Sequence, residues 1–275
     1  MATAKFKNVS PYVKISERHH DLSDWKYDNY LKSLALGEEG PSSATGKFSQ
    51  IVLGLFGLGR AGTIHLNNLL ANREVKIKYI VDGDTVRCES VQRRLNLSEV
   101  TFLLPEEADR LYHDTEVNAV MVATPTYTHE EYITKSLEAG KAVFTEKPVS
   151  EDAHAVDRVY QLAAKMNLPL FCAFNRRFDP SMSDVRHRIQ NGQLGQVQQI
   201  KLTSRDSPLP SVAYLKISGG IFHDCMVHDI DLMTFILGEY PVQVFTLANA
   251  LTPEIAQLDD HDNVVSTFKF ASGWC

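Results

Sequence analysis

The sequence is poor in three features that mark other classes of protein: cysteine, basic charge and long hydrophobic runs. Its four cysteines, Cys88, Cys172, Cys225 and Cys275, are scattered without the pairing that metal sites use, and they suit a reducing compartment. A net charge of −6 offers no basic footprint for nucleic acid or a membrane surface. No segment approaches transmembrane length, and the N-terminal MATAKFKNVSPYVK lacks both an apolar leader core and the arginines of a transit peptide. We therefore expect a cytoplasmic protein that binds neither nucleic acid nor membrane.

Length and hydrophobic content leave room for two domains. The chain has 275 residues, of which 44% are hydrophobic. Residues 1–49 are read as an N-terminal extension, in which Trp25–Leu36 is either one amphipathic helix or part of a weakly ordered tail. Strand and helix patterns then alternate over residues 50–173, which predicts an α/β Rossmann domain on a doubly wound parallel sheet. Residues 174–275 predict an α+β substrate domain with an open, largely antiparallel sheet.

Apolar runs of strand length mark the elements of both domains. In the first domain they predict strands near 51–56, 76–81, 100–104, 118–123, 141–145 and 168–173. Thr128 and Glu131 predict a capping box for the helix after Pro125, and Ser150 is the predicted N-cap of the next helix. In the second domain the pattern predicts helices near 180–190 and 221–237, with strands near 196–204, 241–249 and 263–270.

The stretch Ile51–Asp82 carries a dinucleotide-binding fingerprint. An apolar strand leads into Gly57-Leu58-Gly59-Arg60-Ala61-Gly62, a helix follows, and a second strand ends on Asp82, 25 residues after Gly57. Gly57 permits the tight turn, Gly59 lets the backbone approach a pyrophosphate, and Gly62 lets the helix pack closely on the strand. The helix N-terminus then offers N–H donors to phosphates. A glycine turn alone is often only structural, but here both strands and the acid are present.

The acid at the end of the second strand favours NAD as the cofactor. The Asp82 carboxylate suits a ribose 2′-hydroxyl, and its charge repels the 2′-phosphate of NADP. Arg60 and Arg87 lie near enough in the sequence to weaken that preference, so NADP stays an alternative.

The helix predicted near 221–237 carries a candidate acid–base pair. At about 100° per residue, Phe222, Met226, Ile230, Met233 and Leu237 fall on one apolar stripe. Asp224, His228 and Asp231 fall on the opposite side, and Asp224 and His228 are an i,i+4 pair whose side chains are predicted to meet. Such a face is often only solvated, yet Asp with His suits proton transfer. A metal site at His223, Asp224, His228 and Asp229 is the weaker reading, because no thiolate or third ligand cluster supports it.

A second candidate is Thr145-Glu146-Lys147-Pro148, at the end of a predicted strand. Open α/β sheets bind ligands at the carboxyl ends of their strands, and Ala123-Thr124-Pro125 ends a strand that borders the same crevice. Pro148 allows a cis turn that directs Lys147 into the crevice. Without further context the segment is equally an ordinary polar loop.

Five motifs in one order carry a family resemblance: GLGRAG with Asp82, ATPTYTH (123–129), AGKAVFTEKP (139–148), FNRRFDP (174–180) and GGIFHDCMVHDIDL (219–232). Over roughly residues 50–270 the chain resembles the glucose–fructose oxidoreductase / inositol dehydrogenase (Gfo/Idh/MocA) family of NAD(P)-dependent sugar and polyol oxidoreductases, and most of all an inositol 2-dehydrogenase. The motifs are specific as a set although each is weak alone.

The resemblance implies roles for individual residues. Lys147, Asp224 and His228 match catalytic positions that also contact substrate, while Arg177 and, less securely, Asp206 match substrate-binding positions. Cofactor contacts are expected from Gly57, Gly59, Arg60, Ala61, Gly62, Asp82, Thr124, Pro125, His129 and Glu146. No metal is expected.

The reaction implied is oxidation of a secondary hydroxyl of a cyclic polyol or sugar, with inositol the best single guess. His228 would take the hydroxyl proton, Asp224 would orient it, Lys147 would stabilise charge on the reacting oxygen, and the partner would be the small-molecule substrate. Two alternatives stay open: an NAD-binding regulator without turnover, and a related reductase of a sugar or dihydrodiol.

The chain differs from the family at both ends. The 49-residue extension is longer than usual. Family members continue with further strands of the second-domain sheet, whereas this sequence stops at Cys275, directly after Val264–Phe270. We therefore expect a truncated substrate domain, homo-oligomers through its sheet only if that domain is complete, and, for this form, NAD binding with little dehydrogenase activity.

Overall fold

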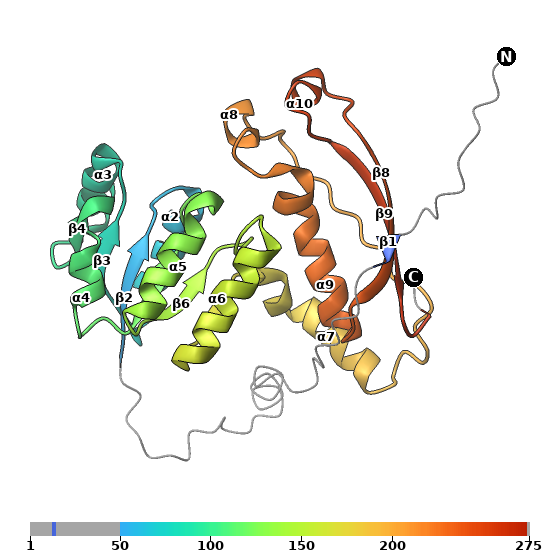
Figure 1. Cartoon of the computed structure of the whole chain (residues 1–275), viewed down its shortest axis with the longest axis horizontal. Coiled ribbons are helices and arrows are strands. Elements are labelled where there is room, and N and C mark those ends of the chain that lie inside the picture. Colours follow the sequence, from blue (N-terminus) through green and yellow to red (C-terminus); the bar gives the residue numbers. More distant parts are fainter. Residues whose placement is uncertain (1–12, 15–49, 274–275) are drawn as a thin grey trace. The chain divides into compact units, whose positions relative to one another are not determined.

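A computed structural model describes residues 13–14 and 50–273, which divide into two compact units (Figure 1). The first unit is described over residues 50–174 and the second over residues 13–14 and 175–273. The predicted helix at Trp25–Leu36, the remaining residues of the extension other than 13–14, and Cys275 lie outside the described residues.

A six-stranded parallel sheet forms the centre of the first unit. The strands are β2 (Ile51–Phe56), β3 (Val75–Val81), β4 (Thr101–Leu103), β5 (Ala119–Val122), β6 (Ala142–Thr145) and β7 (Leu170–Cys172). Their order across the sheet is β4-β3-β2-β5-β6-β7, and every neighbouring pair is parallel. All six predicted strands are confirmed. Because the chain starts at the centre and winds outward in both directions, the carboxyl ends of β2 and β5 adjoin at the point where the winding reverses.

Helices cover both faces of this sheet, so the unit has two hydrophobic cores. One core lies under α2 (Arg60–Leu70) and α3 (Thr85–Leu95) and includes Leu53, Leu55 and Leu66. The other lies under α4 (Asp109–His113), α5 (His129–Glu138) and α6 (Ala153–Met166) and includes Phe56 and Val122. Alternate residues of β2 point into opposite cores, as the period of a strand requires. The doubly wound fold is therefore confirmed.

Two predicted helix caps are wrong in detail. The Thr128 side chain makes no capping bond to α5; its Oγ1 donates to the Pro125 carbonyl oxygen at 2.8 Å instead, because a 3₁₀ turn, η3 (Thr126–Thr128), precedes the helix. The N-cap of α6 is Asp152, not Ser150, and its Oδ1 accepts the His154 N–H at 2.9 Å. Ser150 lies two residues too early, where its Oγ accepts the Asp152 N–H.

The second unit combines helices with an antiparallel sheet. It contains a 3₁₀ turn, η4 (Asn175–Phe178), and then α7 (Pro180–Gln190), α8 (Val212–Leu215), α9 (Val227–Leu237) and α10 (Pro253–Ala256). Strands β8 (Pro241–Asn249) and β9 (Asn263–Phe270) pair antiparallel along their length, and β1 (Val13–Lys14) pairs with β8. A small core of Leu232, Phe235 and Ile236 on α9 packs against Met182 and Ile189 of α7.

The predicted strand at 196–204 is absent from the described part of the second unit, where this segment has no regular structure. A strand persists only where a neighbouring strand bonds to it, and no described strand bonds to this segment. The alternating residues Ile200 and Leu202 that suggested a strand pack against the α9 core instead. The prediction of the two later strands is confirmed.

Helix α9 does not start as an ordinary α-helix. Residues Phe222–Met226 form a π-helix, labelled η5, and the α geometry begins at Val227. The wider turn interrupts the assumed 100° period, and in the C-terminal half five consecutive residues, 232–236, are buried. The predicted single apolar stripe is therefore wrong: Phe222, its first member, is 37% exposed.

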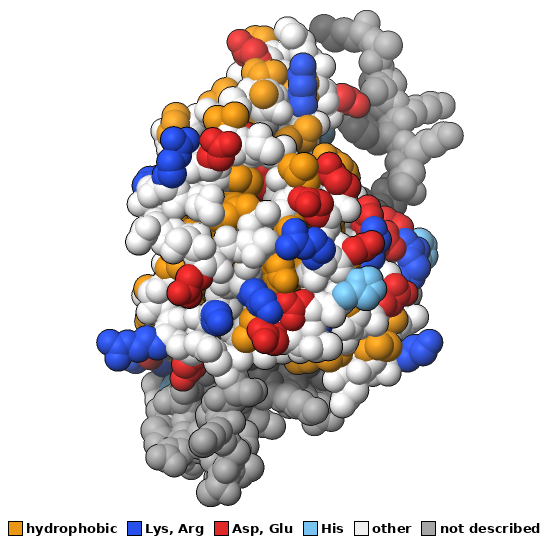
Figure 2. Space-filling view, turned by 90° about the vertical axis from the view of Figure 1, so that its left-hand side faces the viewer, with side chains coloured by type: hydrophobic (Ala, Val, Ile, Leu, Met, Phe, Trp, Pro, Cys, Tyr) orange, Lys and Arg blue, Asp and Glu red, His pale blue; other side chains and the backbone are white. Residues whose placement is uncertain are grey.

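Charges of both signs are interspersed on the face of the molecule shown in Figure 2, without a broad patch of either sign. Across residues 13–14 and 50–273, no helix is both long enough and apolar enough to span a membrane.

Candidate active site

The glycine turn after β2 has the geometry that close packing demands. Gly57 has φ +91°, and a Cβ there would lie 2.5 Å from the Ala123 carbonyl oxygen. A Cβ on Gly62 would lie 2.0 Å from the Gly57 carbonyl oxygen, so α2 can sit this close only with glycine. A Cβ on Gly59, the N-cap of α2, would meet nothing within 4 Å. The protein itself therefore requires Gly57 and Gly62, whereas the space over Gly59 is open for a phosphate group.

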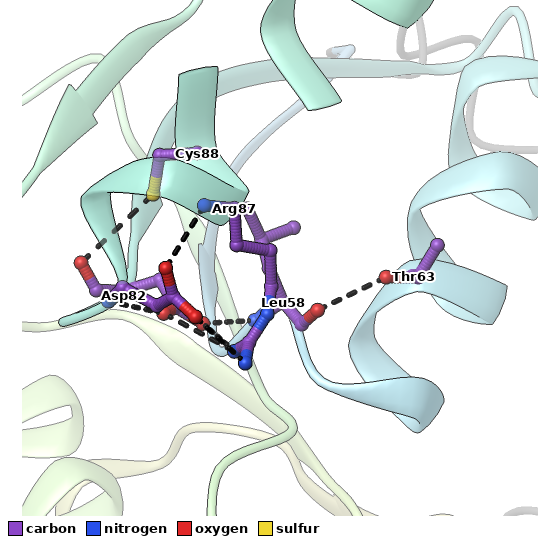
Figure 3. Close-up of polar contacts among 6 residues, drawn as sticks. Leu58, Thr63, Asp82, Arg87 and Cys88 are labelled. Atoms are coloured by element: carbon purple, nitrogen blue, oxygen red, sulfur yellow. Dashed lines mark hydrogen bonds and ion pairs between the residues drawn. The ribbon is translucent and has the colours of Figure 1, made fainter. Parts of the chain in front are cut away.

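Asp82 closes this turn from the end of β3 (Figure 3). Its Oδ2 accepts the Leu58 N–H at 2.6 Å, and its Oδ1 accepts the Asp84 N–H at 2.8 Å. Arg87 Nη1 lies 3.4 and 3.5 Å from the two oxygens. A carboxylate has about four acceptor positions. The two N–H groups occupy two of them, and ribose hydroxyls can replace the longer Arg87 contacts at the others. The sequence predicted the acid but not its bond to the glycine turn.

An open pocket of about 740 Å³ adjoins the turn, within the size range of cofactor sites. Its lining combines apolar side chains with three arginines and consists of Leu58, Gly59, Arg60, Thr63, Asp84, Val86, Arg87, Ser90, Val91 and Arg94. Arg87 Nη2 pairs with Asp84 at 3.0 Å, so part of its charge is already neutralised. The open space at Gly59, the acid at the strand end and this pocket fit the diphosphate, ribose and base of a dinucleotide.

We expect Asp82→Ala to weaken NAD binding by about 10- to 100-fold, because it removes both charge-assisted acceptors and the partner of the Leu58 N–H. The difference in affinity between NAD and NADP should become smaller, since the 2′-phosphate of NADP no longer meets a carboxylate. Asp82→Asn is the matched variant: it keeps an oxygen for Leu58 but loses the charge, and should narrow the gap with a smaller loss of NAD affinity. Titration of both cofactors by fluorescence measures this. Tighter binding of NADP than NAD by the unmutated chain would contradict the role of Asp82.

The loop after β5 is fixed by a buried histidine. His129 is 1% exposed, with Nε2 2.9 Å from the Thr124 carbonyl oxygen and Nδ1 2.8 Å from that of Pro148. Burial lowers the pKa of His129, and the hydrogen bonds with the Thr124 and Pro148 carbonyl oxygens oppose that shift. Its nitrogens face main-chain atoms of two loops, at the ends of β5 and β6. Direct contact of Thr124, Pro125 and His129 with the cofactor stays a prediction; what the structure shows is that His129 holds the two loops together.

Glu146 and Lys147 follow β6, at the same edge of the sheet. The predicted cis peptide bond between Lys147 and Pro148 is present. Glu146 Oε1 lies 2.6 Å from His65 Nε2 on α2, and Oε2 accepts the Lys147 N–H at 3.1 Å. Sequence analysis assigned Glu146 to the cofactor and did not identify His65. Its position three residues after Gly62, on the same helix as the glycine turn, was the only available signal.

Asp224 lies in the π-helix of the second unit and His228 in the first turn of α9. Both Asp224 carboxylate oxygens lie 2.8 Å from the Tyr214 hydroxyl, which donates to them. Tyr214 belongs to α8, a four-residue helix that the sequence pattern did not predict. Asp224 is therefore oriented by a hydroxyl donor that sequence analysis missed. The direct contact between Asp224 and His228 stays a prediction.

Two arginines of the NRRF turn bind acids of α9. Arg177 donates from Nε and Nη2 to Asp231 at 2.9 and 2.6 Å, and Arg176 pairs with Asp229. Asp229 also accepts a hydrogen bond from the Ser204 hydroxyl at 2.9 Å. Arg176, Ser204 and Asp229 line an open pocket of about 510 Å³ within the second unit. The predicted substrate residue Arg177 thus has a structural partner. The other predicted substrate residue, Asp206, is exposed in a stretch without regular secondary structure. Their contact with substrate is not tested by this arrangement.

Arg177→Met should destabilise the protein by about 3–5 kcal/mol, because it leaves the Asp231 carboxylate buried without its guanidinium partner. The Asp231 side chain is only 8% exposed. Arg188→Met is the control, since Arg188 and Asp184 are 51% and 55% exposed and such pairs contribute little. Urea unfolding measures both variants. The double variant Arg177→Met/Asp231→Leu should recover most of the loss; an equal effect of Arg177→Met and Arg188→Met would show that the buried pair is not important for stability.

Comparison with known proteins decides the family. Residues 51–174 match the sequence profile described as "Oxidoreductase family, NAD-binding Rossmann fold", and residues 182–275 match the "GFO/IDH/MocA C-terminal domain". The chain belongs to the Gfo/Idh/MocA oxidoreductase family. Residues 51–174 are therefore an NAD-binding Rossmann domain, as predicted, and the family resemblance is confirmed.

Within the Gfo/Idh/MocA family, inositol dehydrogenases are among the most similar relatives. The chain is 35% identical over 221 residues to an inositol 2-dehydrogenase of Rhizobium meliloti and 36% identical over 222 residues to a myo-inositol 2-dehydrogenase of Thermotoga maritima. Each match covers 80% of this chain and 65% of the relative, so the chain spans about two thirds of their length. A crystal structure of scyllo-inositol dehydrogenase from Lactobacillus casei with NAD(H) and scyllo-inositol superposes with a TM-score of 0.73 at 25% identity, over 82% of this chain and 67% of the other.

Proposed function

We propose that the protein oxidises a secondary hydroxyl group of a cyclic polyol with NAD, and that myo-inositol, converted to the 2-keto inositol, is its substrate. Similarity to dehydrogenases of myo- and scyllo-inositol supports the substrate class. The observation that carries the proposal is the bond between Tyr214 of α8 and Asp224, four residues before His228, together with an NAD site in the first unit. A carboxylate fixed by a hydroxyl donor, four residues before a histidine, is suited to orient an imidazole for proton transfer.

Each residue has a defined role in this proposal. NAD, when bound, supplies the acceptor for the hydride of the carbinol carbon. His228 takes the hydroxyl proton, while Asp224 orients the imidazole and stabilises its charged form. Lys147 donates a hydrogen bond to the reacting oxygen and stabilises the negative charge that develops on it. Arg177 and Asp206 bind other hydroxyls of the ring. The proposal includes a cytoplasmic location and, if the second domain is complete, a homo-oligomer through its sheet. Analytical ultracentrifugation would measure the oligomeric state.

The deciding experiment is a screen of NADH formation by the chain with myo-inositol, scyllo-inositol, hexoses and dihydrodiols, alongside NAD titration. Turnover of an inositol above that of every other class supports the proposal. Preference for a sugar or dihydrodiol would assign a related reductase instead. Because little activity is expected of the 275-residue form, the screen includes a version extended by the C-terminal segment of a relative. Tight NAD binding without turnover in both forms would favour a regulatory protein and contradict the enzyme assignment.

A further inference from the structure

His65 makes a short contact that neither the glycine turn nor the proposed chemistry requires. It lies on α2, six residues after the N-cap Gly59, and its Nε2 is 2.6 Å from Glu146 Oε1. The side chains of His65 and Glu146 are 22% and 21% exposed, so water screens this pair less than an ordinary surface pair. The contact joins the helix of the glycine turn to the loop of Lys147, 81 residues away in the sequence.

The orientation of the His65 ring is fixed by packing. The ring meets Phe144 of β6 edge to face, with centroids 5.7 Å apart, and Phe144 stacks on Phe171 of β7 at the same distance. Burial alone would raise the pKa of Glu146, but the hydrogen bond with His65 and the Lys147 N–H bring that pKa below its usual value. Glu146 is therefore ionised at neutral pH, and His65 Nε2 carries the proton and donates.

The second oxygen of the same carboxylate holds the main chain of Lys147. Glu146 Oε2 accepts the Lys147 N–H at 3.1 Å, so one carboxylate links the imidazole on α2 to the backbone that carries the ammonium group. On the other side of Lys147, His129 Nδ1 lies 2.8 Å from the Pro148 carbonyl oxygen. The residues on either side of Lys147 are thus contacted by histidines of two different helices: Glu146 by His65 and Pro148 by His129.

We propose that His65 is a positioning residue, which orients Glu146 and through it places Lys147 for reaction with the substrate oxygen. The catalytic part of this inference rests on the role of Lys147 in the proposed function. It also assigns Glu146 a task in addition to any cofactor contact, because both of its oxygens bond within the protein. Since α2 carries the glycine turn, the link places Lys147 and the diphosphate-binding turn on one connected framework. Small errors in such placement are costly to catalysis.

The test compares His65→Leu, which removes the donor, with His65→Gln, which keeps an N–H at similar reach. Hydrogen–deuterium exchange at the Lys147 amide measures how firmly the Glu146 carboxylate holds that N–H, and it does not depend on turnover. In His65→Leu that exchange should accelerate by about tenfold or more, because the carboxylate loses its fixed orientation. Turnover should fall by about 10- to 100-fold with KM for the polyol and NAD affinity within about twofold. His65→Gln should keep most of the exchange protection at Lys147 and most of the turnover. His154→Leu, at an exposed histidine of α6, is the control.

Unchanged exchange at Lys147 in His65→Leu would overturn the inference. Equal losses in the Leu and Gln variants would also overturn it, because they would show that ring packing rather than the donor matters. Faster exchange with unchanged turnover would contradict the catalytic role of Lys147 in the proposed function, and with it the positioning role. If the unmutated chain turns over no polyol, the proposed function fails separately, and the exchange comparison still decides whether His65 holds Lys147.

Discussion

In a form with a complete second domain, alanine in place of Lys147 or His228 is expected to lower turnover by about 10²–10⁴-fold and to leave NAD affinity within about twofold. Each change removes a group that acts on the substrate hydroxyl, either as proton acceptor or as donor to the reacting oxygen. Neither side chain lines the pocket beside Asp82, so cofactor binding should persist. Steady-state NADH formation measures turnover, and NADH fluorescence measures binding.

Matched controls exist for both side chains. His223→Ala removes an exposed imidazole whose Nδ1 lies 3.0 Å from the Gly219 carbonyl oxygen, in the same π-helix as Asp224. Lys165→Ala removes an exposed lysine near the end of α6. Both should keep nearly full turnover. A loss of less than about threefold in Lys147→Ala and in His228→Ala would place the chemistry elsewhere.

A single methyl group at Gly62 should abolish useful NAD binding. Its Cβ would lie 2.0 Å from the Gly57 carbonyl oxygen and 2.8 Å from the Gly57 carbonyl carbon, and neither atom is part of a flexible side chain. The turn must open or α2 must move away from β2, which we expect to weaken NAD binding by about 100-fold or more and to cost about 1–3 kcal/mol of stability. Fluorescence titration and thermal unfolding measure the two effects.

Gly59→Ala separates ligand contact from packing. A Cβ at Gly59 meets no protein atom within 4 Å, so the melting temperature should change little. NAD affinity should still fall, because the methyl group occupies the space that the diphosphate needs. Normal NAD affinity in Gly59→Ala would show that the diphosphate does not pass over this residue. Normal stability and affinity in Gly62→Ala would show that the turn is not packed as described.

Local sequence patterns predicted most of the first unit and the candidate site residues that follow its strands. Gly57, Gly62 and Asp82 are separated by short, regular elements, so their spacing alone brings them together. The doubly covered strands were equally visible, because a fully buried parallel strand is apolar throughout. The family resemblance then added Lys147 and Glu146, which no periodicity distinguishes from an ordinary loop.

The partners of these residues could not be predicted because they are distant in sequence or lie in irregular segments. His65 reaches Glu146 across 81 residues, and Tyr214 reaches Asp224 from a four-residue helix that no pattern indicated. The strand predicted at 196–204 failed for a related reason: alternation reports burial, whereas a strand also needs main-chain bonds to a neighbouring strand. The hydrogen-bond partners could therefore be identified only from the structure, even where the site residues themselves were predicted from the sequence.

The π-helix before α9 has a consequence for how this gene can vary in length. A turn closed by i→i+5 bonds contains one residue more than an α turn, and Phe222–Met226 holds that extra residue directly around Asp224. Deletion of one residue here can be absorbed by a return to α geometry, with α9 and the elements after it unchanged. The same deletion inside Val227–Leu237 would rotate everything on one side of it by about 100° and turn the buried run 232–236 away from its core. Length variants should therefore concentrate in the π-helix and spare α9.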